Sequence, residues 1–160
     1  ERHYGALQGL NKKETAIKYG EKKVLLWRRG FEIKPPEIDT LDHEKLKNSQ
    51  PYTNIDPQDI PKSESLEDVV KRFLPIWKNN ILNSIKVKKV IIVAHGNSLR
   101  ALIMHLKNLS KEEIIKLNIP TGIPLVITLN KNLEIVDDYY LGDQNEIKNK
   151  ISAVSNQSKL

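Results

Sequence analysis

The residues after Ser65 carry the longest helical periodicity in the chain. Apolar side chains recur there three or four residues apart, which places them on one face of a helix. They are Leu66, Val69, Val70, Phe73, Trp77 and Ile81. Asp68 lies in the first turn, as is typical of a helix start. Pro75 should bend the helix, because proline removes one amide donor and crowds the preceding turn.

A different pattern follows, in which polar and apolar positions do not alternate. Residues 90–94 form an apolar, mostly β-branched run, which predicts a strand buried on both faces, as in a parallel sheet. Helical spacing returns from Ser98, with an apolar stripe at Leu99, Leu102, Ile103 and Leu106.

Shorter elements precede and follow these two. Asn11 and Gly20 are suited to begin and end a first short helix, and a second helix should cover about residues 21–29. The proline-rich residues 31–62 are typical of a long surface excursion.

Toward the C-terminus, Ser110 and Glu113 form a capping box for another helix. Residues 125–129 and 134–140 are expected to be two strands. A last helix should begin near Asp143, ahead of the polar tail 155–160.

Helix, buried strand and helix in alternation predict an α/β fold, a three-layer sandwich around a mostly parallel sheet. The 160 residues suffice for one domain, 1–160, with a core of its own. A parallel strand needs neighbours reached by crossover connections, and only 90–94 has the character of a central strand. We therefore expect an incomplete sheet that lacks its N-terminal strands.

Composition narrows the function classes. Hydrophobic residues make up 39% and charged residues 29% of the chain, a balance typical of a globular protein. The absence of cysteine excludes disulfides, thiolate metal sites and a cysteine nucleophile. The longest apolar run is too short to cross a bilayer, and the sequence opens with no signal-type segment. The sequence thus predicts a cytoplasmic protein without a membrane partner.

The net charge of +6 and the pI near 9.4 favour anionic partners. The lysines are mixed with acidic residues and form no long block, so nucleic-acid binding is not expected. Small phosphorylated metabolites remain as candidate partners. The simpler interpretation, that the lysines are only solvated, also stays open. His43 and His105 have no companions at metal-ligand spacing, so no metal site is expected.

The most informative stretch surrounds His95, at the end of the predicted buried strand and directly before a helix. In open α/β sheets this edge binds ligands. The free amides of the helix start attract anions, and Gly96 lets a phosphate approach the backbone. A histidine here can stabilise a transferring phosphoryl group. The alternative is a histidine that merely ends a strand.

Other charged residues are ambiguous by themselves. Arg28 and Arg29 leave a helix end together, and guanidinium groups match phosphate and carboxylate oxygens. On spacing alone, complementing the helix dipole is the favoured interpretation of the pair, and Lys12 could equally be solvated. Glu1, beside cationic residues, could act as a general acid or base, although a first residue is normally frayed.

Three stretches form a recognisable set: Glu1–Lys12, Ala94–Arg100 and Leu117–Val126. Shorter motifs accompany them in order, namely Trp27-Arg28-Arg29, Pro35-Pro36, Ser63-Glu64-Ser65-Leu66 and Tyr139-Tyr140-Leu141-Gly142. Together they resemble the cofactor-dependent phosphoglycerate mutases of the histidine phosphatase superfamily. The resemblance covers essentially the whole chain and is specific to the mutase branch.

The resemblance implies an isomerase of glycolysis and gluconeogenesis that interconverts 3-phosphoglycerate and 2-phosphoglycerate. Transfer would pass through a phosphohistidine primed by 2,3-bisphosphoglycerate, without a metal. Glu1 would be the general acid/base, and His95 would stabilise the phosphoryl group in flight. The implied substrate-binding residues are Arg2, His3, Tyr4, Lys12, Arg28, Arg29, Gly96 and Asn97. The polar tail would cover the site, and, since many members pair, a homo-oligomer is an open expectation.

The chain departs from the family pattern at the nucleophile, a histidine in an Arg-His-Gly motif. Arg2-His3 is followed by Tyr4, and Arg-His-Gly occurs nowhere in the sequence. By the family pattern, a portion carrying that histidine and the absent sheet neighbours precedes Glu1. We therefore expect no mutase activity from these 160 residues alone. The alternatives are a bisphosphoglycerate mutase, another histidine phosphatase, or a non-catalytic phosphate-binding remnant.

Overall fold

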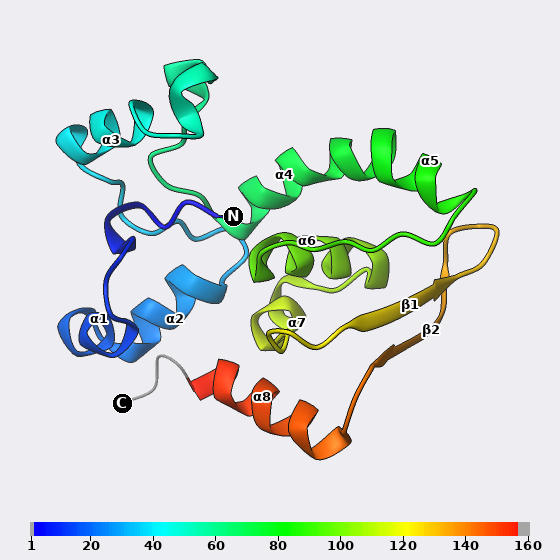
Figure 1. Ribbon diagram of the computed structural model, residues 1–160. Helices are drawn as coiled ribbons and strands as arrows, with labels where there is room; N and C mark the ends of the chain where they lie inside the picture. The colour runs from blue at the N-terminus through cyan, green and yellow to red at the C-terminus, as the bar shows by residue number, and fades with distance from the viewer. Residues whose placement is uncertain (1, 157–160) are drawn as a thin grey trace.

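The computed structural model describes residues 2–156, which form mainly helices and one small sheet (Figure 1). The α-helices are α1 (Lys12–Tyr19), α2 (Glu21–Arg29), α3 (Thr40–Lys47), α4 (Leu66–Ile76), α5 (Leu82–Ile85), α6 (Gly96–Lys107), α7 (Lys111–Lys116) and α8 (Gln144–Asn156). The strands are β1 (Leu125–Leu129) and β2 (Ile135–Tyr140). Short 3₁₀ turns cover η1 (Gly5–Leu7), η2 (Tyr52–Asn54) and η3 (Pro57–Asp59), and η4 (Trp77–Ile81) is a π-helical turn.

The end signals in the sequence mark helix ends in the structure. The side chain of Asn11 accepts hydrogen bonds from two amides at the start of α1, and Gly20, with φ at 85°, ends it. Ser65 and Asp68 form a reciprocal capping box at the start of α4. Each bond satisfies an amide that would otherwise lack a helical partner, so these helix boundaries are confirmed.

The long helix predicted after Ser65 is built in three parts, because η4 separates α4 from α5. Pro75 lies inside α4 and has no amide hydrogen to donate to the preceding turn. The wider turn of η4 begins two residues later, at Trp77. Helical turns of this kind occur where the regular hydrogen-bond ladder is interrupted.

The excursion at 31–62 contains more regular structure than the sequence suggested, because α3 forms within it. Asp39 caps this helix, and ion pairs join Lys45 to Asp42 and Lys47 to Glu44. Most of its residues are polar, so the apolar periodicity that reveals an amphipathic helix is weak here. The excursion therefore contains a regular helix as well as loop segments.

The strand predicted at 90–94 does not form in the described residues. This segment runs without regular structure from α5 to the start of α6 (Figure 1). Ile91 is 90% exposed and Val93 is 92% exposed, so burial on both faces is also wrong for this chain. No strand in residues 2–156 pairs with this segment, so its backbone groups have no ladder partners.

The α/β class is nevertheless confirmed, since the helices accompany a sheet. The sheet consists of β1 and β2, which pair antiparallel with Leu125 opposite Tyr140. A register irregularity between Thr128 and Leu129 lies beside the turn. The predicted boundaries of both strands agree with the structure to within one residue.

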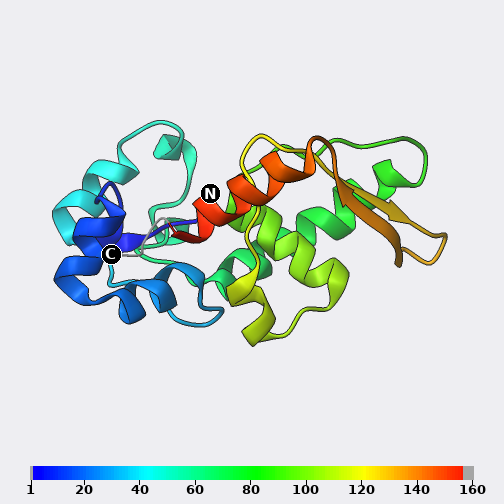
Figure 2. The same ribbon diagram turned by 90° about the horizontal axis from the view of Figure 1, so that it is seen from below.

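Two apolar clusters hold the helices together. The larger one lies among α4, α6 and α7, and its buried members are Leu66, Val69, Ala101 and Ile114. The smaller one joins η1 to α2 and consists of Leu7, Val24 and Trp27. In Figure 1 and in Figure 2 the C-terminal end of α8 is directed toward the α1–α2 pair. No helix within residues 2–156 is both long enough and apolar enough to span a membrane.

Candidate anion-binding pocket

A pocket of about 330 Å³ opens where segments distant in the sequence converge. The ends of α2 and α8, the start of α6, and the loop after α7 all contribute to its wall. The lining residues are Tyr4, Lys12, Arg28, Arg29, His95, Gly96, Asn97, Arg100, Leu117, Asn118, Ile119, Thr121 and Val154. Seven residues that the sequence singled out therefore lie around one cavity.

The start of α6 forms one wall of the pocket. His95 is the N-cap residue, and its side chain makes no capping hydrogen bond. Gly96 follows at the first helical position, and a β-carbon there would meet no atom within 4 Å. The first amides of a helix have no partners within the helix and favour negative charge. This wall is thus open to an anion and carries an exposed histidine at its edge.

Tyr4 links this wall to the arginines of α2. Its hydroxyl accepts a hydrogen bond from Nδ2 of Asn97 at 2.9 Å. The guanidinium of Arg28 lies 4.7 Å from the centre of its ring, a cation–π distance. Gly5 holds the turn after Tyr4: its φ is +57°, and a β-carbon there would lie 2.1 Å from the carbonyl oxygen of Pro36.

Arg29 crosses the pocket from the end of α2. Its Nη1 donates to the carbonyl oxygen of Leu117, and its Nη2 donates to that of Val154, both at 3.2 Å. Arg29 thereby connects α2 with the loop after α7 and with the last turn of α8. A guanidinium has five N–H donors, so these two bonds do not exhaust the donors of this lining residue.

The pocket concentrates positive charge. Lys12, Arg28, Arg29 and Arg100 line it, and none of the described lining residues is acidic. Burial lowers the pKa of Lys12 below its ordinary value of 10.5, and the charges of Arg28 and Arg29 lower it further. Burial also lowers the pKa of Arg29. Cations that repel one another in this way are stabilised when an anion enters.

Arg100 was not predicted as a site residue, yet it lies between the pocket and the core. It is 6% exposed and donates to Oδ1 of Asn97 at 3.3 Å, to the carbonyl of Arg29 at 3.1 Å and to that of Ile114 at 2.6 Å. Burial, followed by the charge of Arg29, lowers its pKa to about 10. Its spacing of three residues from Asn97 on a helix could have revealed it.

Like Thr121, Asn118 is a polar lining residue that was not predicted as a site residue. Its Oδ1 is buried and has no hydrogen-bond partner among the described residues, as is also true of Nε of Arg100. The loop that carries Asn118 has no periodic pattern, so only its place in the stretch Leu117–Val126 marks it.

Two predicted binding residues lie outside this pocket. Arg2 is 1% exposed and donates to the carbonyl oxygens of Glu64, Arg28, Trp27 and Ile33. The ring of His3 lies against Tyr52, with Nε2 3.4 Å from the tyrosine hydroxyl. Arg2 therefore supports the helix end that carries Arg28, and a substrate contact of Arg2 or His3 stays a prediction. Glu1 lies outside the described residues.

His43 and His105 also lie outside the pocket. His43 is buried, and its Nε2 lies 3.0 Å from the carbonyl oxygen of Ile60, as suits a structural residue. His105 is exposed on α6. Within residues 2–156, no group of three or more histidine, aspartate or glutamate side chains is placed to hold a metal ion.

The arrangement is suited to a ligand with several negative charges. Guanidinium and ammonium groups together with helix amides can hold phosphate and carboxylate groups. A phosphoryl group transferred beside His95 would meet preorganised donors at the place where its charge develops.

Comparison with known proteins identifies similar chains. The family described as "Histidine phosphatase superfamily (branch 1)" matches residues 39–137. The chain is 52% identical to the 2,3-bisphosphoglycerate-dependent phosphoglycerate mutase of Borreliella afzelii (strain PKo). It is 50% identical to the protein of the same name from Borreliella burgdorferi (strain ZS7). Both alignments cover 100% of this chain, which spans 65% of the length of each relative.

Proposed function

Because the chain belongs to the histidine phosphatase superfamily, we propose that it carries the substrate pocket of a 2,3-bisphosphoglycerate-dependent phosphoglycerate mutase. The protein would interconvert 3-phosphoglycerate and 2-phosphoglycerate in glycolysis and gluconeogenesis, and so act in the cytoplasm. One observation carries the proposal: Tyr4, Lys12, Arg28, Arg29, His95, Gly96 and Asn97 line a single cationic pocket. The two relatives at 52% and 50% identity bear the name of this activity.

The charged and hydrogen-bonding groups of the pocket match those of the proposed substrate. A phosphoglycerate presents a phosphate and a carboxylate, which match the guanidinium groups of Arg28 and Arg29. Lys12 adds a third positive charge, and the Gly96–Asn97 turn offers backbone and amide donors. 2,3-Bisphosphoglycerate, with one more phosphate, fits the same donor set and would supply the priming phosphoryl group.

His95 and Glu1 take different roles in the proposed transfer. When the phosphoryl group passes from a histidine nucleophile to the substrate hydroxyl, a P–N bond breaks and a P–O bond forms. The hydroxyl proton must then leave, and the carboxylate of Glu1 would accept it. His95 would donate hydrogen bonds to the phosphoryl oxygens, stabilising the charge in the transition state.

The experiment is a mutase assay on the full-length protein. We expect 3-phosphoglycerate to yield 2-phosphoglycerate only when 2,3-bisphosphoglycerate is supplied. His95→Ala should lower kcat by about 100-fold or more, the usual cost of a lost transition-state donor. His105→Ala is the matched control: the residue is exposed on the same helix, so its loss should leave kcat within about twofold.

Other outcomes would contradict this function. Release of inorganic phosphate as the main reaction would favour a histidine phosphatase. Formation of 2,3-bisphosphoglycerate as the main product would favour a bisphosphoglycerate mutase.

The 160-residue chain alone contains no Arg-His-Gly, so it should bind 3-phosphoglycerate in calorimetry without turning it over.

A further inference from the structure

Glu64 is a buried carboxylate that lies outside the pocket. It precedes the N-cap of α4 and is 3% exposed. A buried carboxylate is costly unless it is paired and hydrogen-bonded, so its partners indicate its role. Arg72 supplies one: Nε donates to Oε1 at 2.7 Å and Nη2 donates to Oε2 at 3.2 Å.

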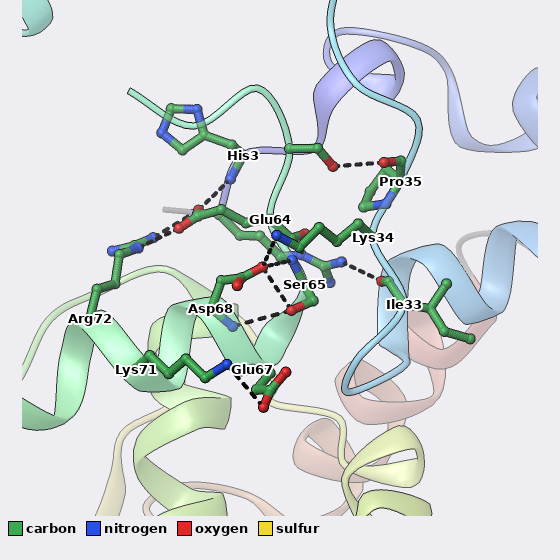
Figure 3. Close-up of polar contacts among 12 residues, drawn as sticks. His3, Ile33, Lys34, Pro35, Glu64, Ser65, Glu67, Asp68, Lys71 and Arg72 are labelled. Atoms are coloured by element: carbon green, nitrogen blue, oxygen red, sulfur yellow. Dashed lines mark hydrogen bonds and ion pairs between the residues drawn. The ribbon is translucent and has the colours of Figure 1, made fainter. Parts of the chain in front are cut away.

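The other partner of the carboxylate is the backbone of the N-terminal segment. The amide of His3 donates to Oε2 of Glu64 at 2.9 Å. The reverse bond also forms, since the amide of Glu64 donates to the carbonyl oxygen of His3 at 2.9 Å. Figure 3 shows the Glu64 side chain between the His3 backbone and the Arg72 guanidinium.

The side chain of Arg2 is also hydrogen-bonded to residue 64. Nε of Arg2 donates to the carbonyl oxygen of Glu64 at 2.8 Å, while Nη2 of Arg2 donates to that of Trp27 at 2.7 Å. Residue 64 therefore holds both Arg2 and His3 through its backbone and its carboxylate. Such a set of buried bonds leaves the backbone of residues 2 and 3 little freedom.

We infer that Glu64 is a positioning residue for the proton transfer assigned to Glu1, an inference that rests on the proposed function. Glu1 directly precedes Arg2 and His3 in the sequence, so the backbone that Glu64 fixes is the part of the chain next to the assigned acid/base. An acid/base must lie within hydrogen-bond reach of the proton that it moves. A displacement of about 1 Å can cost about 100-fold in rate.

A purely structural role predicts something different. If Glu64 served only stability, its removal would affect every reaction of the protein to the same extent. If it positions the acid/base, the loss must depend on how much the leaving group needs a proton. Phosphoglycerates leave as poor alkoxides, whereas p-nitrophenolate leaves without protonation.

The test compares the two leaving groups in the full-length protein. Glu64→Ala should lower kcat for phosphoglycerate interconversion by about 10- to 100-fold. The burst of nitrophenolate from p-nitrophenyl phosphate, which reports transfer to the nucleophile, should change by less than about threefold, since this step needs no general acid. Glu64→Gln should recover most of the rate, because its amide oxygen can still accept from the His3 amide.

Glu67→Ala is the matched control. Glu67 lies in the first turn of α4, three residues after Glu64, and its carboxylate pairs with Lys71 at 3.1 Å, with 36% of the side chain exposed. Its removal should leave both rates unchanged. If Glu64→Ala fails to fold, Arg72→Met removes the outer partner of the carboxylate and should shift the ratio of the two rates in the same direction.

Equal losses for the two substrates, no loss at all, or no rescue by glutamine would overturn the positioning role. These outcomes require a wild-type protein that interconverts phosphoglycerates. A wild-type protein that does not do so would instead refute the proposed function, and the inference would be refuted with it.

Discussion

Nη2 of Arg29 donates a hydrogen bond to the carbonyl oxygen of Val154 at 3.2 Å, joining the end of α2 to the last turn of α8. The same guanidinium holds Leu117 through Nη1. A residue expected to bind substrate is thus also the link that places the C-terminal helix beside the pocket. Anion binding and the position of α8 should therefore depend on one another.

Arg29→Lys tests this coupling. A lysine keeps the charge but loses the planar fork, so it cannot reach both carbonyls and the ligand at once. We expect 3-phosphoglycerate to bind about tenfold more weakly, equivalent to about 1.4 kcal/mol, and the amides of α8 to exchange hydrogen faster. Calorimetry and hydrogen exchange measure the two effects. Lys148→Met, on the exposed face of α8, should change neither, and an unaltered α8 in Arg29→Lys would contradict the coupling.

The lowered pKa of Lys12 predicts an alkaline limit to anion binding. In the free protein the pKa of the Lys12 ammonium lies below its ordinary value of 10.5, because of burial and the neighbouring charges of Arg28 and Arg29. A bound anion raises the same pKa. Affinity should therefore be full below the pKa of the free protein and fall as the pH rises through it.

The measurement for Lys12 is the dissociation constant of 3-phosphoglycerate from about pH 8 to about pH 10, where the phosphate is fully ionised. Lys12→Arg should flatten the profile over this range, because arginine stays protonated. Lys13→Arg is the control, since Lys13 is exposed beside it and does not line the pocket. An alkaline loss that persists in Lys12→Arg would assign it to another group.

Structural features set by neighbouring residues could be predicted from the sequence, and features set by distant segments could not. Asn11 and Ser65 accept hydrogen bonds from amides a few residues away, and Gly20 ends α1 through its own backbone conformation. The sequence therefore locates the ends of α1 and the start of α4 correctly. The hairpin of β1 and β2 is also local. The state of 90–94 depends on strands elsewhere, and an apolar run cannot show whether they are present.

The residues of the pocket also differ in whether the local sequence or only the fold reveals them. His95 and Gly96 are recognisable because a histidine and a glycine at a helix start carry a local chemical meaning. Arg100 is not, since its role comes from carbonyls of Arg29 and Ile114 that only the fold brings to it. Arg2 is the reverse case. The family resemblance assigns it to the substrate, whereas in the structure its guanidinium donates to backbone carbonyl oxygens.

Arg100→Met measures what the buried guanidinium contributes to stability. The substitution leaves the carbonyl oxygens of Arg29 and Ile114 and the amide oxygen of Asn97 without this donor. Buried acceptors that lose their partner cost about 1–3 kcal/mol, so we expect the free energy of unfolding in urea to fall by about 2–3 kcal/mol. Lys107→Met, which breaks the part-exposed pair with Asp138, should cost about 1 kcal/mol or less. Equal costs for the two variants would contradict the structural role of Arg100.

Val93→Lys distinguishes an exposed segment from a central strand. In the 160-residue chain the Val93 side chain is 92% exposed, so a lysine should change the free energy of unfolding by less than about 0.5 kcal/mol. In a protein of the relatives' full length, the family resemblance implies strands beside 90–94. A lysine would then be buried without a partner and should cost about 3 kcal/mol or more.

Val87→Lys is the control for this comparison, because Val87 is 82% exposed and precedes the apolar run. It should be tolerated in both proteins. Urea denaturation of the four variants gives the answer as a difference between chain lengths. A small effect of Val93→Lys in the longer protein would mean that 90–94 stays unpaired there. A large effect in the 160-residue chain would mean that the segment is packed against something even without the additional strands.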